Sequence, residues 1–161
     1  MIFATRGLDA PLSSVAKEAG VGQGSLYRHF PTRYSLALAV FEENVDELEK
    51  IAAVEGSTLG DLLRAITAQA IVSTAFFEMI QIEKTDDAGR QLIDHIGSIF
   101  SPKIADARAD GQLAEWITTD DVLLGVAMLA GALSKTHHDE RDAVATRAWA
   151  LLPFGPTALQ S

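Results

Sequence analysis

The stretch LSSVAKEAGVGQGSLYRHF, residues 12–30, predicts two short helices joined by a tight turn. Gly20 stands where the first helix must stop, a position that often takes the left-handed conformation that glycine adopts at low cost. The second helix is expected from about Gln23, and its residues Leu26 and Phe30, four apart, share one face. A helix-turn-helix is therefore predicted. Its inner side is expected to hold Val15, Ala16, Ala19 and Val21, and its outer side Gln23, Ser25, Tyr27, Arg28 and His29.

The rest of the chain has the apolar spacing of amphipathic helices, and it shows neither strand alternation nor an internal repeat. Capping residues mark two expected helix starts, Thr58 with Asp61 and the run 118–121. Gly111 suits a helix end, and Pro102 predicts a break or kink. The predicted class is all-α. Helices are expected over residues 36–52, 58–83, 86–109 and 120–135, and from Asp139 to just before Pro153.

The composition is that of a globular protein. The 161 residues are 48% hydrophobic and 22% charged, which allows one or two small domains with a substantial core. The absence of cysteine excludes a disulfide framework, thiol catalysis and Cys-ligated zinc. The uncharged stretches 65–77 and 122–134 have 13 residues each, whereas a transmembrane helix needs about 20. The first residues lack a signal-peptide pattern. We expect a soluble cytoplasmic protein with no membrane partner.

The net charge of −9 argues by itself against a nucleic-acid partner, but the charge is unevenly distributed. Residues 1–35 hold four basic and two acidic residues, a net charge of +2. Residues 36–161 hold nine basic and twenty acidic residues, a net charge of −11. This asymmetry predicts a mildly basic head, residues 1–35, on an acidic helical body, residues 36–161.

The head also carries a recognisable signature: Ala16-x-x-Ala19-Gly20-Val21-x-x-Gly24-Ser25-Leu26-Tyr27-x-His29-Phe30-x-x-Arg33-x-x-Leu36. It resembles the DNA-binding signature of the tetracycline-repressor (TetR) family of bacterial regulators. The resemblance implies a three-helix DNA-binding head and a larger helical body that dimerises and binds a small ligand. Family members usually begin with a full first helix preceded by a basic arm, whereas residues 2–7 correspond here only to the end of that helix, so we expect the first helix to be truncated.

The resemblance also implies roles for the polar side chains of the head. The start of the second helix would face base edges in the major groove, and other positions would hold phosphates. A solvated helix face is the alternative interpretation of the same residues. The base-facing candidates are Gln23, Gly24 and Ser25, and the phosphate-binding candidates are Ser13, Tyr27, His29 and Arg33.

In the body, the helix expected over residues 120–135 is apolar on every side. It should therefore be buried both by its own domain and by something else. Together with the last helix it would form a four-helix bundle across a two-fold axis, an interface that the resemblance also implies. A large monomeric core is the alternative. The expected interface residues are Val122, Val126, Leu129, Leu133, Val144, Ala148, Trp149 and Leu152.

A ligand pocket is predicted from aromatic and large apolar residues of the body, although plain core is an equally good interpretation of them. No cofactor is expected, and no metal site, because His137 and His138 are adjacent in a loop instead of sharing a helix face. The nucleophile elbow, P-loop and dinucleotide fingerprints are missing from the sequence. The pocket candidates are Phe76, Phe77, Ile80, Phe100 and Trp116.

These observations predict a ligand-responsive transcriptional repressor and not an enzyme. It would bind a palindromic DNA operator as a homodimer and be released by a small-molecule inducer whose identity is unknown. Two alternatives stay open: a helical protein that binds a small molecule without binding DNA, and an all-α enzyme whose site is assembled only in space.

Overall fold

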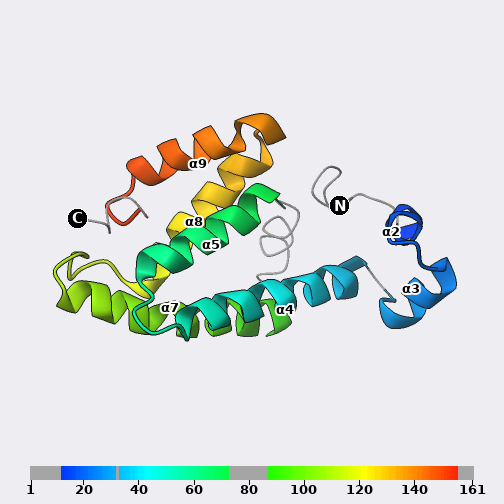
Figure 1. The fold of residues 1–161 in the computed structure, drawn as a ribbon, viewed down its shortest axis with the longest axis horizontal. Helices are drawn as coiled ribbons and strands as arrows, with labels where there is room; N and C mark the ends of the chain where they lie inside the picture. The colour runs from blue at the N-terminus through cyan, green and yellow to red at the C-terminus, as the bar shows by residue number, and fades with distance from the viewer. Residues whose placement is uncertain (1–11, 32, 73–86, 156–161) are drawn as a thin grey trace.

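The computed structural model describes residues 12–31, 33–72 and 87–155, which form helices joined by turns (Figure 1). Within these ranges the chain contains no strand, and the predicted all-α class is confirmed. The helices are α2 (Leu12–Glu18), α3 (Gln23–His29), α4 (Arg33–Ala52), α5 (Leu59–Val72), α7 (Asp87–Ala109), α8 (Thr119–Ser134), the short 3-10 helix η2 (His138–Glu140) and α9 (Arg141–Ala150).

Capping boxes start α5 and α8, as the sequence predicts. At α5 the amide of Asp61 donates to the Thr58 hydroxyl at 3.2 Å, and the amide of Thr58 donates to the Asp61 carboxylate at 2.8 Å. Thr118 and Asp121 repeat both bonds at α8. The hydroxyl and amide of Thr58 and the guanidinium of Arg64 lower the pKa of Asp61 from 3.8 to about 2.

Left-handed glycines end two of the helices. Gly20 has a φ of +67° after α2, and Gly111 has a φ of +71° after α7, so both predicted stops are confirmed. Of the expected break or kink at Pro102, the break is wrong, because α7 runs through this residue, and the kink stays a prediction. Because proline has no amide hydrogen, Pro102 cannot donate to the carbonyl of Ser98, its usual helical partner. Both residues lie on the exposed side of α7, where water can donate to that carbonyl instead.

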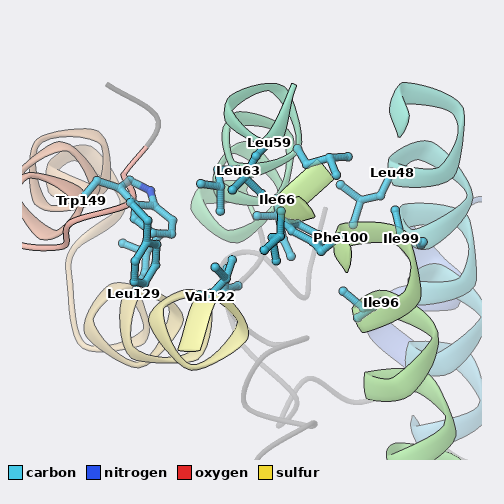
Figure 2. Packing of buried hydrophobic residues seen from close by; sticks show 14 of the residues in the cluster. Leu48, Leu59, Leu63, Ile66, Ile96, Ile99, Phe100, Val122, Leu129 and Trp149 are labelled. Carbon is cyan, nitrogen blue, oxygen red and sulfur yellow. The ribbon is translucent and has the colours of Figure 1, made fainter. Parts of the chain in front are cut away.

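The body has one core, to which α4, α5, α7, α8 and α9 all contribute. Phe100 of α7 lies at its centre, fully buried. Figure 2 shows Ile66 of α5 beside Phe100, with Trp149 of α9 and Leu129 of α8 packed together farther along the core. In the described ranges, no helix is long and apolar enough to cross a membrane.

The head has a separate small core, made of Ala16, Leu26 and Leu36 with Val15 and Phe30 against it. Figure 1 shows α2 and α3 at the N-terminal end of α4, away from α8 and α9. Helix α4 therefore belongs to both parts, since its residue Leu36 lies in the head core while Val45 and Leu48 lie in the body core.

Two details of the head differ from the sequence prediction. Val21, expected inside, is 44% exposed, and Ala19 is also exposed. Leu36, expected on the amphipathic helix of the body, packs in the head instead. The physical reason is that α4 begins at Arg33, so its first turn lies against α3 and fills the space beside Leu26.

Candidate nucleic-acid interface

Helix α3 is short and is held at both ends by backbone hydrogen bonds. Gly22 is its N-cap, with extended backbone, and its carbonyl accepts from the amides of Ser25 at 3.0 Å and Leu26 at 3.1 Å. At the other end the amide of Phe30 donates to the carbonyl of Leu26 at 2.8 Å. Glycine is an acceptable N-cap, so α3 forms without a side-chain cap bond.

One apolar side chain orients this helix. Leu26 is buried against Ala16 of α2 and Leu36 of α4. Ala16 is fully buried, and its small side chain lets α2 and α3 approach closely. Because Leu26 points into this core, the opposite side of α3 must face away from the protein.

The structure brings five of the predicted DNA-binding residues together on α3. All of them are exposed, and Tyr27 is among the largest exposed apolar side chains of the described chain. Ser13 is half-buried on α2, and Arg33 begins α4, where its side chain lies outside the described residues. The five exposed residues are Gln23, Gly24, Ser25, Tyr27 and His29.

The exposed surface of the head also carries positive charge. Lys17 lies in the last turn of α2, and Arg28 and His29 lie in the last turn of α3. The sequence analysis placed Arg28 outside but gave it no role. The sequence does contain a signal for such a role: Arg28 comes two residues after Leu26, so it lies on the opposite side of the helix from the buried Leu26.

The site is therefore a helix-turn-helix whose second helix presents a polar, partly cationic face to solvent, on top of an all-helical body. Residues 1–40 match the bacterial regulatory proteins of the tetR family. A similar protein is the HTH-type transcriptional repressor KstR of Mycolicibacterium smegmatis, 28% identical over 115 residues. That match covers 65% of this chain and 55% of the relative's length. The resemblance to the tetR family that the sequence predicts is thus confirmed for residues 1–40.

In the body, the structure corrects the predicted interface on α8. Four of its residues are buried in the core of this same chain, because that side of α8 packs against α5, α7 and α9. They are Val122, Val126, Leu129 and Leu133. Of the predicted residues on the last helix and the turn after it, Trp149 is buried as well, and Val144, Ala148 and Leu152 are half-buried against the same core.

A different side of α8 is exposed. Leu124 and Met128, one turn apart, are each 58% exposed, and Leu151 after α9 is 85% exposed. Neither α8 residue is among the interface residues predicted from the sequence. Since α8 is apolar on every side, its pattern alone could not show which side faces solvent.

The predicted pocket residues do not come together in the described part of the chain. Phe100 is fully buried in the body core, whereas Trp116, in the turn between α7 and α8, is 68% exposed. Phe76, Phe77 and Ile80 lie outside the described residues. Trp116 is exposed because the turn of residues 110–118 folds Leu113 and Ile117 inward instead.

Buried polar contacts tie α9 to α5. The indole Nε1 of Trp149 donates to the hydroxyl of Thr67 at 2.8 Å. Arg141, a buried charged residue, donates to the carbonyl of Ile71 at 2.9 Å, close to the end of α5. A cation at the C-terminal end of a helix is favourable, because the last carbonyls there lack helical partners.

Proposed function

We propose that this chain is a transcriptional repressor that binds a palindromic DNA operator as a homodimer and is released by a small-molecule inducer. The observation that carries the proposal is the exposed polar face of α3, set on a small core within a segment that matches a family of regulatory proteins. Each α3 would enter one major groove, with half-sites one or more DNA turns apart, about 34–36 Å per turn.

The exposed side of α8 supports the homodimer. Leu124 and Met128 lie one turn apart, and the exposed Gly131 follows on the same side, where it allows a second helix to approach closely. Large exposed apolar side chains on successive turns of one helix are typical of a protein–protein interface. We propose that α8 meets α8 of a second copy along this side, with Leu151 at its edge.

Light scattering at micromolar concentration tests the homodimer. The double variant Leu124→Glu with Met128→Glu should be a monomer, because it places charges in the proposed contact. Val54→Glu is the matched control, since Val54 is 59% exposed but lies in the turn between α4 and α5. A monomeric wild-type protein, or a dimeric double variant, would rule out this interface.

The position of α4 supports the proposed release mechanism. This helix runs unbroken from Arg33 to Ala52, with its first turns in the head core and its later turns in the body core. Polar contacts also hold it to the body: the side chain of Gln69 donates to the carbonyl of Asn44 at 3.1 Å, and His95 Nε2 lies 2.8 Å from the carboxylate of Glu49. A ligand that shifts the body would therefore tilt α4 and move the head.

The inducer part of the proposal rests on the family resemblance and on Phe76, Phe77 and Ile80 as pocket candidates. Operator and inducer must oppose each other reciprocally. A compound that raises the melting midpoint of the free protein and occupies this site should weaken operator binding. If a saturating compound leaves operator affinity unchanged, the α4 mechanism is wrong.

Selection of bound DNA from a random pool tests the function itself. We expect enrichment of an inverted repeat, with affinity falling steeply as salt rises, because phosphate contacts release counterions. No enrichment at low salt would instead favour a helical protein that binds a small molecule without binding DNA.

A further inference from the structure

The centre of the exposed face of α3 is occupied by Gly24 and Arg28. Successive residues of a helix are rotated by about 100°, so positions two before and two after Leu26 both lie about 160° away from it. Leu26 is buried in the head core, and both Gly24 and Arg28 are exposed. The two residues are one turn apart and lie on the side of α3 opposite its buried side chain.

Nothing in the described structure requires glycine at position 24. Its φ is not positive, unlike those of Gly20, Gly56 and Gly111. A Cβ added to Gly24 would meet no heavy atom within 4 Å. Glycine inside a helix destabilises it relative to alanine. A glycine that the protein's own packing does not need is typical of a place where another molecule must come close to the backbone.

Arg28 is suited to use that space. Side chains of a helix lean toward its N-terminus, so the side chain of Arg28 lies over the turn that contains Gly24. Within the described part of the chain, its guanidinium has no hydrogen bond or ion pair. The planar guanidinium presents paired donors that match the O6 and N7 acceptors of guanine in the major groove.

We infer that Arg28 reads a guanine in each operator half-site, and that the missing side chain at Gly24 lets α3 approach closely enough for it to do so. This inference rests on the proposed DNA-binding function. It makes Arg28 a specificity-determining residue, whereas Lys17, on α2, would supply charge alone.

The experiment compares the DNA sequences selected by the wild-type chain with those selected by Arg28→Ala, Arg28→Lys and Lys17→Ala. The wild type should select a guanine at one fixed position of each half-site. Arg28→Ala should lose the preference for that base by about 5- to 150-fold, while the other positions keep theirs. Arg28→Lys should also lose much of it, because lysine keeps the charge but not the paired donors. Lys17→Ala should keep the same preferred sequence.

Gly24→Ala is a second, independent variant, since the added methyl group has open space in the protein. Its melting midpoint should equal or exceed that of the wild type. Its affinity for the selected operator should nevertheless fall at least several-fold, and its binding to random DNA should fall less. An affinity equal to that of the wild type would overturn the role of Gly24.

The outcomes separate this inference from the proposed function. If the wild-type chain selects no DNA, the proposed function fails and the inference fails with it. If the wild type selects an inverted repeat and Arg28→Ala selects the same bases with the same preference, DNA binding stands and the role of Arg28 is wrong.

Discussion

Replacing Gly125 with alanine tests how the turn of residues 151–154 packs on α8. A Cβ at this position would lie 2.7 Å from Cε2 and 2.8 Å from Cζ of Phe154, and 3.2 Å from Cδ1 of Leu152. Phe154 is buried, and its ring meets the indole of Trp149 edge-on, with centroids 6.3 Å apart. The ring therefore has little room to move away from an added methyl group.

The expected magnitude is a balance of two effects. Overpacking a buried site costs about 1–3 kcal/mol, and alanine in place of a helical glycine gains up to about 1 kcal/mol. Gly125→Ala should therefore lower the free energy of unfolding by about 0–2 kcal/mol. Gly97→Ala is the matched control, because its Cβ would meet Leu123 at 3.7 Å and Thr119 at 3.8 Å, which is ordinary contact.

The assay is urea unfolding of both variants and the wild type at one protein concentration, since association would contribute to stability. Gly97→Ala should raise the free energy of unfolding by about 0.5–1 kcal/mol. The two variants should thus differ by about 1–3 kcal/mol, with each kcal/mol shifting the melting midpoint by about 2–4 °C. If Gly125→Ala is as stable as Gly97→Ala, the contact between Phe154 and α8 is not as described.

Four further substitutions test the local chemistry and the DNA-binding residues of α3. Thr58→Ala should cost about 1 kcal/mol at pH 7. The pKa of Asp61 is lowered to about 2 in the folded state, so its ionised carboxylate stabilises the folded protein fully above about pH 4. This contribution to the free energy of unfolding is lost as the pH falls from about 4 toward 2. The loss of unfolding free energy in Thr58→Ala, measured by urea unfolding, should therefore become smaller over that pH range. A loss that does not change with pH would show that the Asp61 carboxylate is not its cause. Thr67→Val should cost about 1–3 kcal/mol at pH 7 by the same assay, because the buried indole N–H of α9 loses its acceptor; an unchanged midpoint would show that this bond contributes nothing. Tyr27→Ala should weaken binding to all duplexes, whereas Gln23→Ala should relax sequence choice at one position, as titrations with operator and random DNA would show; uniform losses from both would remove the base-reading role of Gln23.

Features that depend on a few neighbouring residues were predictable from the sequence. The capping boxes at Thr58 and Thr118 and the left-handed stop at Gly20 involve partners within four residues, so their geometry follows from local spacing. The exposed residues of α3 were predictable for the same reason. Once Leu26 and Phe30 are assigned to the inside, helical geometry places the polar residues outside.

Features that depend on which surfaces meet were less predictable. Pro102 does not break α7, because its exposed side lets water replace the missing hydrogen bond. Leu36 packs in the head because α4 starts earlier than its apolar pattern indicates. Trp116 is exposed because other residues of the same turn fill the core.

The sequence by itself determined the all-α class, the helix-turn-helix and the residues that α3 exposes, because each follows from the helical period and from local turn chemistry. Only the tertiary structure decided which side of α8 faces solvent. That helix is apolar all round, so periodicity cannot orient it, and its orientation depends on α5, α7, α9 and the turn of residues 151–154. Phe154 packing on Gly125 illustrates the reason: contacts between residues distant in sequence, not local pattern, determine which apolar side chains reach solvent.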